Sequence, residues 1–302
     1  MSWWSEFANR IERDTPLGRH TWYRLGGPAR YLFRPRDAED LASLLTRAKH
    51  EDIPVKVLGS GANVLISDDG FDGVVVRLDN DAFCTTTRRG TSLEVGAGVD
   101  LMPLARRCSE QGLSGLECLA GIPATVGGAV RMNAGGRFGE FGTVVREIEV
   151  LRTDGGVETW PHDRIGFRYR RTDLGDGIVL SAQLELVEDD PDRVKRTFDD
   201  LLEYKERSQP LADRSAGCVF KNPVGQSAGA LIDQAGLKGA RYGKAQVSRR
   251  HANFIVAEHG ATASDVLHLI DLIRERVRSV FGTELETEIE IWKPVRARRR
   301  DE

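Results

Sequence analysis

The sequence lacks the features that mark several common functional classes. Its 302 residues include only four cysteines, with neither a CxxC pair nor metal-ligand spacing: Cys84, Cys108, Cys118 and Cys218. We expect reduced thiols, three of them as core fillers, and no metal site. No segment has the apolar length of a membrane span, and the first residues lack the basic and apolar regions of a signal peptide. We therefore expect a cytoplasmic protein.

Neither sign of charge dominates the composition. Forty-three basic and 46 acidic residues give a net charge of −3, which gives no indication of a nucleic-acid or anionic-membrane partner. A basic run occurs only at residues 296–300, after the last periodic segment and without aromatic residues between its charges. We interpret it as a solvated tail rather than a binding arm. The length predicts two or three domains.

Periodicity and turn residues predict a chain of mixed helices and strands. We expect an amphipathic helix over residues 1–13, with its aromatic residues on one face, and a strand ending in a turn over residues 20–27. Further helices are expected after Asp37 and at 100–112, 192–207, 228–235 and 263–280, and strands at 54–58, 64–67, 74–78, 93–95, 147–151, 178–187, 253–257 and 285–292. The charged helix at 192–207 is interpreted as the link to a second unit.

Residues 121–136, GIPATVGGAVRMNAGG, contain five glycines and one charged residue. This composition is too rich in glycine for a stable helix and too apolar for a solvated loop. It is typical of buried backbone that approaches a flat or phosphorylated ligand, with a tightly packed set of turns as the alternative.

A second glycine-rich turn, GSGAN at residues 59–63, follows the predicted strand at 54–58. A strand that delivers such a turn can present backbone donors to a phosphate. The next residues, VLIS, return directly to strand character instead of opening a helix. A dinucleotide site here would therefore not belong to the Rossmann fold, whose fingerprint requires a helix after the glycines.

Seven segments in order resemble UDP-N-acetylenolpyruvoylglucosamine reductase (MurB), over nearly the whole chain from Thr15 to Trp292. They are HTWYRLGG, LGSGANVLISDDGFDGVVVRL, GLECLAGIPATVGGAVRMNAGG, FRYRRTDL, SAGCVFKNP, GKAQVSRRHANFIV and LETEIEIW. The resemblance implies an enzyme of peptidoglycan-precursor synthesis in which NADPH reduces bound FAD. Reduced flavin then passes a hydride to UDP-N-acetylglucosamine enolpyruvate, giving UDP-N-acetylmuramate.

The resemblance also implies an α+β fold of the vanillyl-alcohol-oxidase (PCMH-type) class. Two α+β subdomains, 1–77 and 78–190, would bind FAD, and a C-terminal α+β domain, 191–284, would bind substrate; the strand within 285–302 is expected to pack against the first subdomain. A monomer is expected. Non-covalent FAD is assigned to both glycine segments, through Gly59, Ser60, Gly61, Ala62, Asn63, Val64, Leu65, Gly121, Ile122, Pro123, Thr125, Val126, Gly127, Gly128, Asn133, Ala134 and Gly135.

The reaction needs fixed positive charge and a proton donor, because hydride addition to an enol ether conjugated with a carboxylate places negative charge on the carboxylate side. By resemblance, Arg170 and Glu288 match the family's stabilising arginine and glutamate, and Cys218 occupies the position of its proton-donating serine. A protonated thiol can act as a general acid. The thiol would be a poor proton donor if the charge of Lys221 or Arg170 converted it to a thiolate. The alternative to a catalytic role is an inert cysteine in a protein that has lost activity.

The choice of the arginine and of the glutamate rests on the family motifs. On an extended segment Arg168 and Arg170 would share one face and Arg171 the other, so Arg170 is chosen from the Tyr-Arg pair, with a solvated charge run as the alternative. The glutamates at 286, 288 and 290 would share one strand face, and the LxTE match favours Glu288.

Lys221 and Asn222 suit recognition of a diphosphate or of uridine, although Lys221 could equally be a surface lysine. His251 and Asn253 could serve the nicotinamide or the uridine, with a structural histidine as the alternative.

Only seven residues separate Arg170 from the strand at Ile178. This leaves no room for the tyrosine-bearing loop of one branch of the family, so the chain resembles the shorter, second type. Arg207 and Gln209 are candidates for the residue that covers the UDP in its place. Two rival functions stay open: a flavin oxidase of the same fold, which the SAGCVFKNP segment disfavours, and a flavin- or UDP-sugar-binding sensor without turnover.

Overall fold

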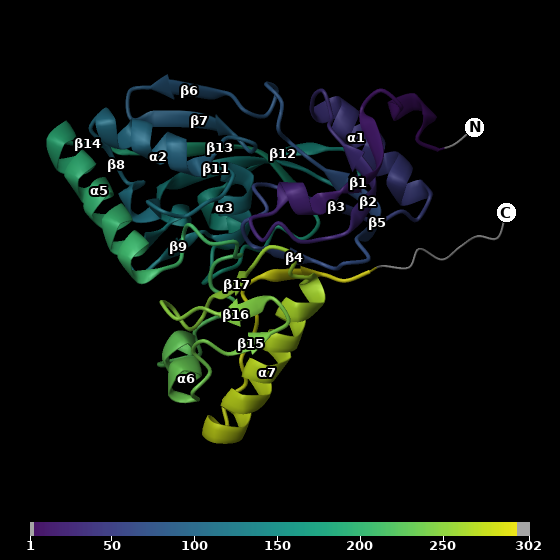
Figure 1. The fold of residues 1–302 in the computed structure, drawn as a ribbon. Coiled ribbons are helices and arrows are strands. Elements are labelled where there is room, and N and C mark those ends of the chain that lie inside the picture. Colours follow the sequence, from purple (N-terminus) through teal and green to yellow (C-terminus); the bar gives the residue numbers. More distant parts are fainter. Residues whose placement is uncertain (1–2, 295–302) are drawn as a thin grey trace.

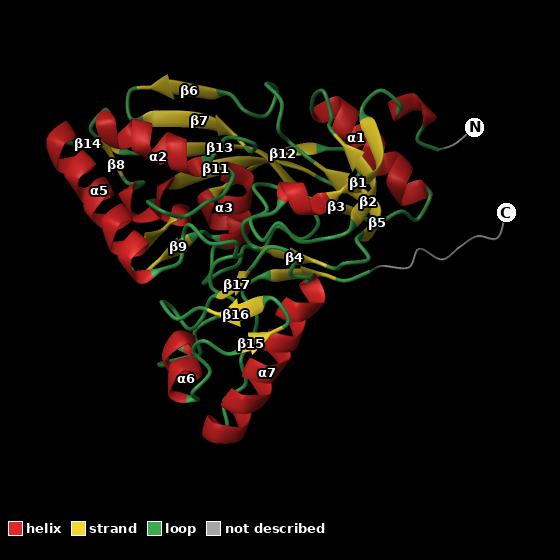
Figure 2. Ribbon diagram, in the orientation of Figure 1, coloured by secondary structure: helices red, strands yellow, loops and turns green. Residues whose placement is uncertain are grey.

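The computed structural model describes residues 3–294, which form two sheet-containing layers and a smaller C-terminal unit below them (Figures 1 and 2). The first layer is a four-stranded sheet in the order β1-β2-β5-β3, with helix α1 beside it. Its elements are β1 (Ile11–Pro16), β2 (Pro28–Phe33), α1 (Ala38–His50), β3 (Val55–Val57) and β5 (Phe71–Val76).

The second layer is a five-stranded antiparallel sheet in the order β12-β11-β13-β7-β6. The strands are β6 (Thr86–Arg89), β7 (Ser92–Gly96), β11 (Val145–Leu151), β12 (Val157–Pro161) and β13 (Ile178–Glu185), and the helices are α2 (Leu101–Glu110), α3 (Val126–Met132), α4 (His162–Ile165) and α5 (Pro191–Ser208). Four short strands form two separate two-stranded sheets, one of β9 (Gly135–Gly136) and β10 (Gly139–Glu140) and the other of β8 (Leu113–Ser114) and β14 (Val187–Glu188). One continuous hydrophobic core joins both layers.

The C-terminal unit has its own core. It contains α6 (Ala228–Gln234), the strands β15 (Arg241–Tyr242), β16 (Ala245–Val247) and β17 (Ile255–Ala257), and the long helix α7 (Ala263–Phe281). The chain then returns to the first layer, where β18 (Glu290–Trp292) pairs parallel with β4 (Val64–Ile66). Trp292 packs on Phe71 with ring centroids 5.6 Å apart. The domain boundaries stay predictions.

Capping residues explain several helix ends. Asp37 accepts a hydrogen bond from the backbone of Asp40 at 2.8 Å, as the sequence predicted for the start of α1. Thr262 and Asp265 form a capping box at the start of α7, and Gly282 ends it in the left-handed conformation. Helix α5 connects the second layer to the C-terminal unit, but it also packs along α2, and its Phe198 belongs to the first core.

Two predictions for the start of the chain are wrong. The predicted helix at 1–13 is instead a 3-10 turn (Ser5–Phe7) followed by β1, because residues from Ile11 onward pair with β2. The predicted strand at 20–27 is a turn and loop, in which the Thr21 hydroxyl donates to the carbonyl oxygens of Gly18 and Leu25. Local side-chain bonds of this kind compete with strand pairing.

The cysteine prediction was partly wrong: all four thiols are free, but only Cys108 is fully buried, while Cys84 is exposed. No helix within residues 3–294 is both long enough and apolar enough to cross a membrane. The basic run at 296–300 lies outside the described residues, as do residues 1 and 2 of the predicted first helix.

Candidate active site

The two glycine segments of the sequence meet face to face. A Cβ added at Gly59 would lie 2.5 Å from the Thr125 Oγ1, and one at Gly61 would lie 2.1 Å from the carbonyl oxygen of His20. Gly61 also has a φ of +70°. Only a residue without a Cβ fits such approaches, so the first segment turns bare backbone toward the second at Gly59, and toward the loop at His20 at Gly61.

The second segment contains helix α3, which corrects the expectation that its glycines exclude a helix. Thr125 caps the helix through its hydroxyl, and Asn133 ends it in the left-handed conformation. Gly127 packs on Ala97: its N–H donates to the Ala97 carbonyl at 2.8 Å, and an added Cβ would come within 3.0 Å of the Ala97 Cβ. Close packing against the sheet therefore outweighs the low helix propensity of glycine.

A cleft of about 850 Å³ opens between the two layers. Five predicted cofactor residues line it: Gly59, Ser60, Thr125, Gly127 and Gly128. Its volume lies within the range of roughly 300–1,000 Å³ that is usual for ligand pockets. Bare backbone on two walls and mixed polar and apolar lining fit the predicted flavin.

The other predicted cofactor residues lie outside the lining of this cleft. Val64, Leu65 and Val126 are buried in the core. Asn63 turns toward the other side of the site, where its Nδ2 donates to the carbonyl oxygen of Glu288 at 3.3 Å. The remaining members of this group are Gly61, Ala62, Gly121, Ile122, Pro123, Asn133, Ala134 and Gly135.

Arg170 lies in a tight turn rather than on the expected extended segment. Arg168 and Arg171 exchange backbone hydrogen bonds across the turn, and Arg170 between them has a φ of +54°. The flanking arginines are about two-thirds exposed and pair with Asp173, whereas the Arg170 side chain is only 13% exposed. The turn therefore directs Arg170 alone inward, and Asn133 supports it by donating to the Arg168 carbonyl at 3.1 Å.

Burial also separates the three glutamates of the last segment. Glu286 and Glu290 are mostly exposed and pair with Lys221 and Lys56, while the Glu288 side chain is 14% exposed. The expected common strand face is wrong, because regular pairing with β4 begins only at residue 290. The N–H of Glu288 donates to the carbonyl of Val219 at 2.8 Å, which brings Glu288 beside the segment that carries Cys218.

Arg170 and Glu288 form a largely buried ion pair with Nε and Oε1 2.6 Å apart. Burial raises the pKa of Glu288, and the Arg170 charge opposes this effect. The Nη1 of Arg170 is buried without a hydrogen-bond partner among residues 3–294. Since an unsatisfied buried donor is costly, this guanidinium edge is suited to an anionic ligand atom such as a carboxylate oxygen.

Cys218 follows Gly217, which has a φ of +75°. A Cβ added at Gly217 would have no neighbour within 4 Å. Burial first, and then the charge of Glu288, raise the pKa of the Cys218 thiol to about 12; Arg170 opposes this shift. The thiolate that nearby cations would favour therefore does not form at neutral pH. The thiol therefore carries the proton that a general acid must hold before it acts.

Comparison with known proteins agrees with this geometry. Residues 209–292 match the model of the family described as "UDP-N-acetylenolpyruvoylglucosamine reductase, C-terminal domain", and residues 29–160 match an FAD binding domain. A protein named UDP-N-acetylenolpyruvoylglucosamine reductase 2 from Symbiobacterium thermophilum is 45% identical, with 94% of this chain and 92% of the relative covered. The chain belongs to the UDP-N-acetylenolpyruvoylglucosamine reductase family.

Two further members of the reductase family are similarly close. The relative from Moorella thermoacetica is 44% identical over 94% of this chain and 93% of its own length. The crystal structure of MurB from Thermus caldophilus superposes with a TM-score of 0.82 at 41% identity, covering 94% of this chain and 99% of that one. The α+β fold predicted from the sequence is thus confirmed.

Several predicted substrate residues of the reductase family motif also make hydrogen bonds to neighbouring backbone. Asn253 is buried and exchanges hydrogen bonds with the backbone of Phe220, and the His251 Nδ1 accepts from the Asn253 N–H at 3.3 Å. Asn222 accepts from the N–H of Ala228 through its Oδ1, at the start of α6. Sequence reasoning could not assign these contacts, because the partners are backbone atoms or belong to residues that are distant in the sequence.

The candidates Arg207 and Gln209 lie at the end of α5. Arg207 is exposed and pairs with Glu203. Gln209 caps α5, and its carbonyl accepts from Arg250 Nη1 at 3.2 Å. Neither side chain contacts the Arg170 and Glu288 pair.

Sequence reasoning missed Lys205, which is 5% exposed. Its Nζ donates to the carbonyl oxygens of Ala120 at 2.5 Å and Cys118 at 3.1 Å, directly before the second glycine segment. Burial lowers the pKa of Lys205 to about 8. Its helix is heavily charged, so the sequence offered no sign that this one lysine points inward.

Proposed function

We propose that this chain reduces the enolpyruvyl double bond of UDP-N-acetylglucosamine enolpyruvate and so forms UDP-N-acetylmuramate for peptidoglycan synthesis. Membership of the reductase family and the FAD-binding-domain match support this function. The observation that carries it is the set of Arg170, Glu288 and Cys218 around an unsatisfied guanidinium edge. The glycine segments around Gly59 and Thr125 would hold FAD, which would supply the hydride taken from NADPH.

Arg170 holds the substrate carboxylate through its free Nη1. Negative charge that develops on the carboxylate side of the double bond then lies next to a cation that needs no reorientation, because Glu288 already holds the Nε. Glu288 acts through Arg170 in this proposal, as a residue that fixes the direction of the guanidinium group.

Cys218 donates the proton. The S–H bond breaks, a C–H bond forms at the carbon next to the carboxylate, and the resulting thiolate recovers a proton from water. Its raised pKa keeps the donor protonated before each turnover. Asn253 and His251 position this residue, since Asn253 binds both backbone groups of Phe220, two residues further along the chain.

Lys221 binds the diphosphate as a point charge, and Asn222, Arg207 and Gln209 contact the uridine side. Lys221 is suited to this role because its Nζ lies near the surface in an ion pair with the exposed Glu286, which an incoming phosphate can replace. We further propose that the protein acts as a monomer in the cytoplasm, which size-exclusion chromatography and cell fractionation would test.

A flavin titration tests the function. The purified protein is predicted to show a flavin spectrum that NADPH bleaches without oxygen and that UDP-N-acetylglucosamine enolpyruvate restores. Absence of bleaching by NADPH would exclude the reductase. Bleaching that the substrate never reverses would favour a sensor without turnover, and bleaching by a sugar or alcohol with reoxidation by oxygen would favour an oxidase.

A further inference from the structure

Tyr169 is an exposed aromatic residue beside Arg170. It lies in the turn that the backbone hydrogen bonds between Arg168 and Arg171 close, directly before the inward-pointing Arg170. Its ring is large and largely apolar, yet Tyr169 is 46% exposed. A single exposed aromatic residue is common on protein surfaces, so the contacts of this ring decide how it is interpreted.

Two contacts place the Tyr169 ring between groups that we assign to the substrate. The Cζ atom of Arg170 lies over the ring, 5.0 Å from its centroid. The Tyr169 hydroxyl accepts a hydrogen bond from the N–H of Asn222 at 3.4 Å. The ring therefore spans the distance from the guanidinium group of Arg170 to the segment that contains Lys221 and Asn222.

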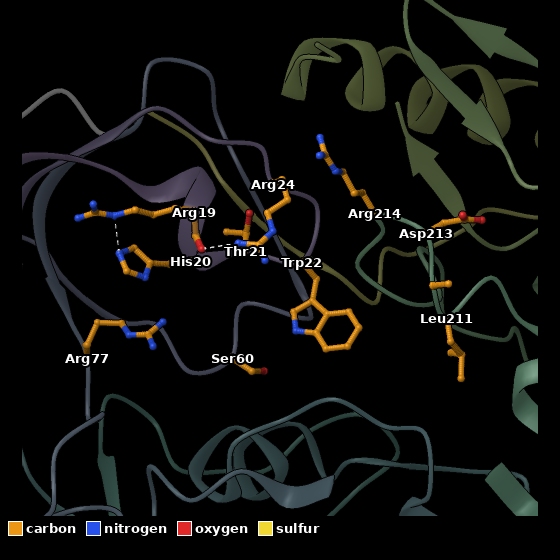
Figure 3. Close-up of a pocket in the computed structure, with 11 residues that line it drawn as sticks. Arg19, His20, Thr21, Trp22, Arg24, Ser60, Arg77, Leu211, Asp213 and Arg214 are labelled. Carbon is orange, nitrogen blue, oxygen red and sulfur yellow. Dashed lines mark hydrogen bonds between the residues drawn. The ribbon is translucent and has the colours of Figure 1, made fainter. Parts of the chain in front are cut away.

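A second exposed aromatic residue, Trp22, lies in a different environment. It lines a cavity of about 400 Å³, and Figure 3 shows its indole near Ser60. Ser60 and Arg77 also line the flavin cleft, so this cavity continues that cleft. Among residues 3–294, its lining includes neither Arg170 nor Asn222, but it includes four arginines: Arg19, Arg24, Arg77 and Arg214. Tyr169 is thus the exposed ring that contacts the substrate side of the site.

The parts of the proposed substrate follow one another in the same order as these contacts. In UDP-N-acetylglucosamine enolpyruvate, the sugar ring lies between the enolpyruvyl carboxylate and the diphosphate, and the uracil lies beyond the diphosphate. The carboxylate is assigned to Arg170 and the diphosphate to Lys221. The part of the substrate that crosses Tyr169 is therefore the sugar.

We propose that Tyr169 is the platform on which the N-acetylglucosamine ring of the substrate packs. This inference rests on the proposed function and adds a substrate-binding residue to it. The C–H groups on one face of a pyranose ring are apolar and pack on the face of an aromatic ring, whereas the sugar hydroxyls at the rim stay free to bind water. A platform beside Arg170 also fixes the direction in which the enolpyruvyl group reaches the guanidinium.

Calorimetry with two ligands that lack the enolpyruvyl group isolates the contribution of the sugar. UDP-N-acetylglucosamine should bind the oxidised holoenzyme more tightly than UDP does, and Tyr169→Ala should reduce this ratio of affinities by about 5- to 20-fold. Tyr169→Phe keeps the ring and removes only the hydrogen bond from Asn222, so it should retain the ratio. Tyr242→Ala is the matched control, because Tyr242 is also 46% exposed and its ring stacks on His268.

Rapid mixing tests the same variants in the substrate step. Tyr169→Ala should raise the substrate concentration for half-maximal reoxidation of the reduced flavin by a similar factor, while flavin reduction by NADPH stays unchanged. Tyr169→Phe and Tyr242→Ala should both behave like the wild-type protein.

Three results would overturn the inference. UDP and UDP-N-acetylglucosamine could bind the wild-type protein equally well, or Tyr169→Ala could leave the ratio unchanged. Tyr169→Phe could also lose as much as Tyr169→Ala, which would assign the effect to the hydrogen bond with Asn222. These binding results do not depend on hydride transfer, so they are distinct from a failure of the proposed function, which would appear as absence of bleaching by NADPH.

Discussion

Two regions of the molecule are built in opposite ways: the flavin cleft, which Gly59, Thr125 and Gly127 line, and the Cys218 region, which also contains Arg170 and Glu288. The cleft is walled by glycine backbone, and Gly59 and Thr125 approach so closely that an added Cβ would overlap. The Cys218 region instead gathers Arg170 and Glu288, two buried charged side chains from segments 118 residues apart. The cleft depends on the absence of side chains at its glycines. The Cys218 region depends on an ion pair, because a buried charge without its partner is costly.

This difference predicts how each region fails. Adding atoms should damage the cleft, while removing polar atoms should damage the Cys218 region and leave flavin binding intact. Variants in the two regions therefore separate cofactor binding from the substrate step.

Cys218→Ala should have the largest effect. Loss of the proton donor should slow flavin reoxidation by the substrate by about 10²–10⁴-fold, the usual contribution of a general acid. Flavin reduction by NADPH should survive, as rapid mixing of each half-reaction would measure. Cys218→Ser should retain substantial turnover, and equal rates in the Ala and Ser variants would show that Cys218 is not the donor.

Arg170→Met should slow the same step by about 10²–10³-fold, comparable to the loss of one preorganised electrostatic donor. It also leaves Glu288 buried without its partner. Arg170→Lys, which keeps the charge, should unfold at a urea concentration nearer to wild type while its substrate step stays slow. The control is Arg168→Met, since that side chain is 67% exposed; an equal loss in both variants would remove the distinction between the two arginines.

Lys205 is an exception to this comparison, because its buried charge holds the backbone that leads into the second glycine segment. Its pKa is lowered from 10.5 to about 8 in the folded protein. Between these values the unfolded chain holds the proton and the native state does not, so unfolding free energy should rise with pH, by order of 3 kcal/mol from this group.

The difference in unfolding free energy between wild type and Lys205→Arg isolates this effect, since arginine stays charged over the whole pH range. Urea unfolding at a series of pH values from 7 to 10 measures it. A difference that does not change with pH would mean that Lys205 keeps its proton at high pH.

Gly59→Ala should have the smallest of these effects, about 1–3 kcal/mol of unfolding free energy from overpacking, together with weaker FAD retention. The added Cβ would lie 2.5 Å from Thr125 Oγ1, whereas at Gly136, in the second segment, it would meet nothing within 4 Å. Gly136→Ala is therefore the control. Measured flavin dissociation constants that match in both variants would contradict the close contact of the two segments.

Capping residues, alternating strands and seven ordered motifs are local signals, and from them the sequence predicts the family, the mixed α+β class and most element positions. It also identified both glycine segments. It misjudged helix α3, which exists because Gly127 packs against Ala97, a contact that composition cannot report.

Contacts between distant segments determine which charged residues point inward. Arg170 points inward because its backbone is left-handed, whereas Arg168 and Arg171 point outward. Glu288 is largely buried, whereas Glu286 is exposed. Neighbours of the same residue type carry equal local signals, while burial and pKa depend on atoms that distant segments supply. The same reason separates Lys205 from the other charges of its helix, and it brings Arg24 and Arg214 to one cavity.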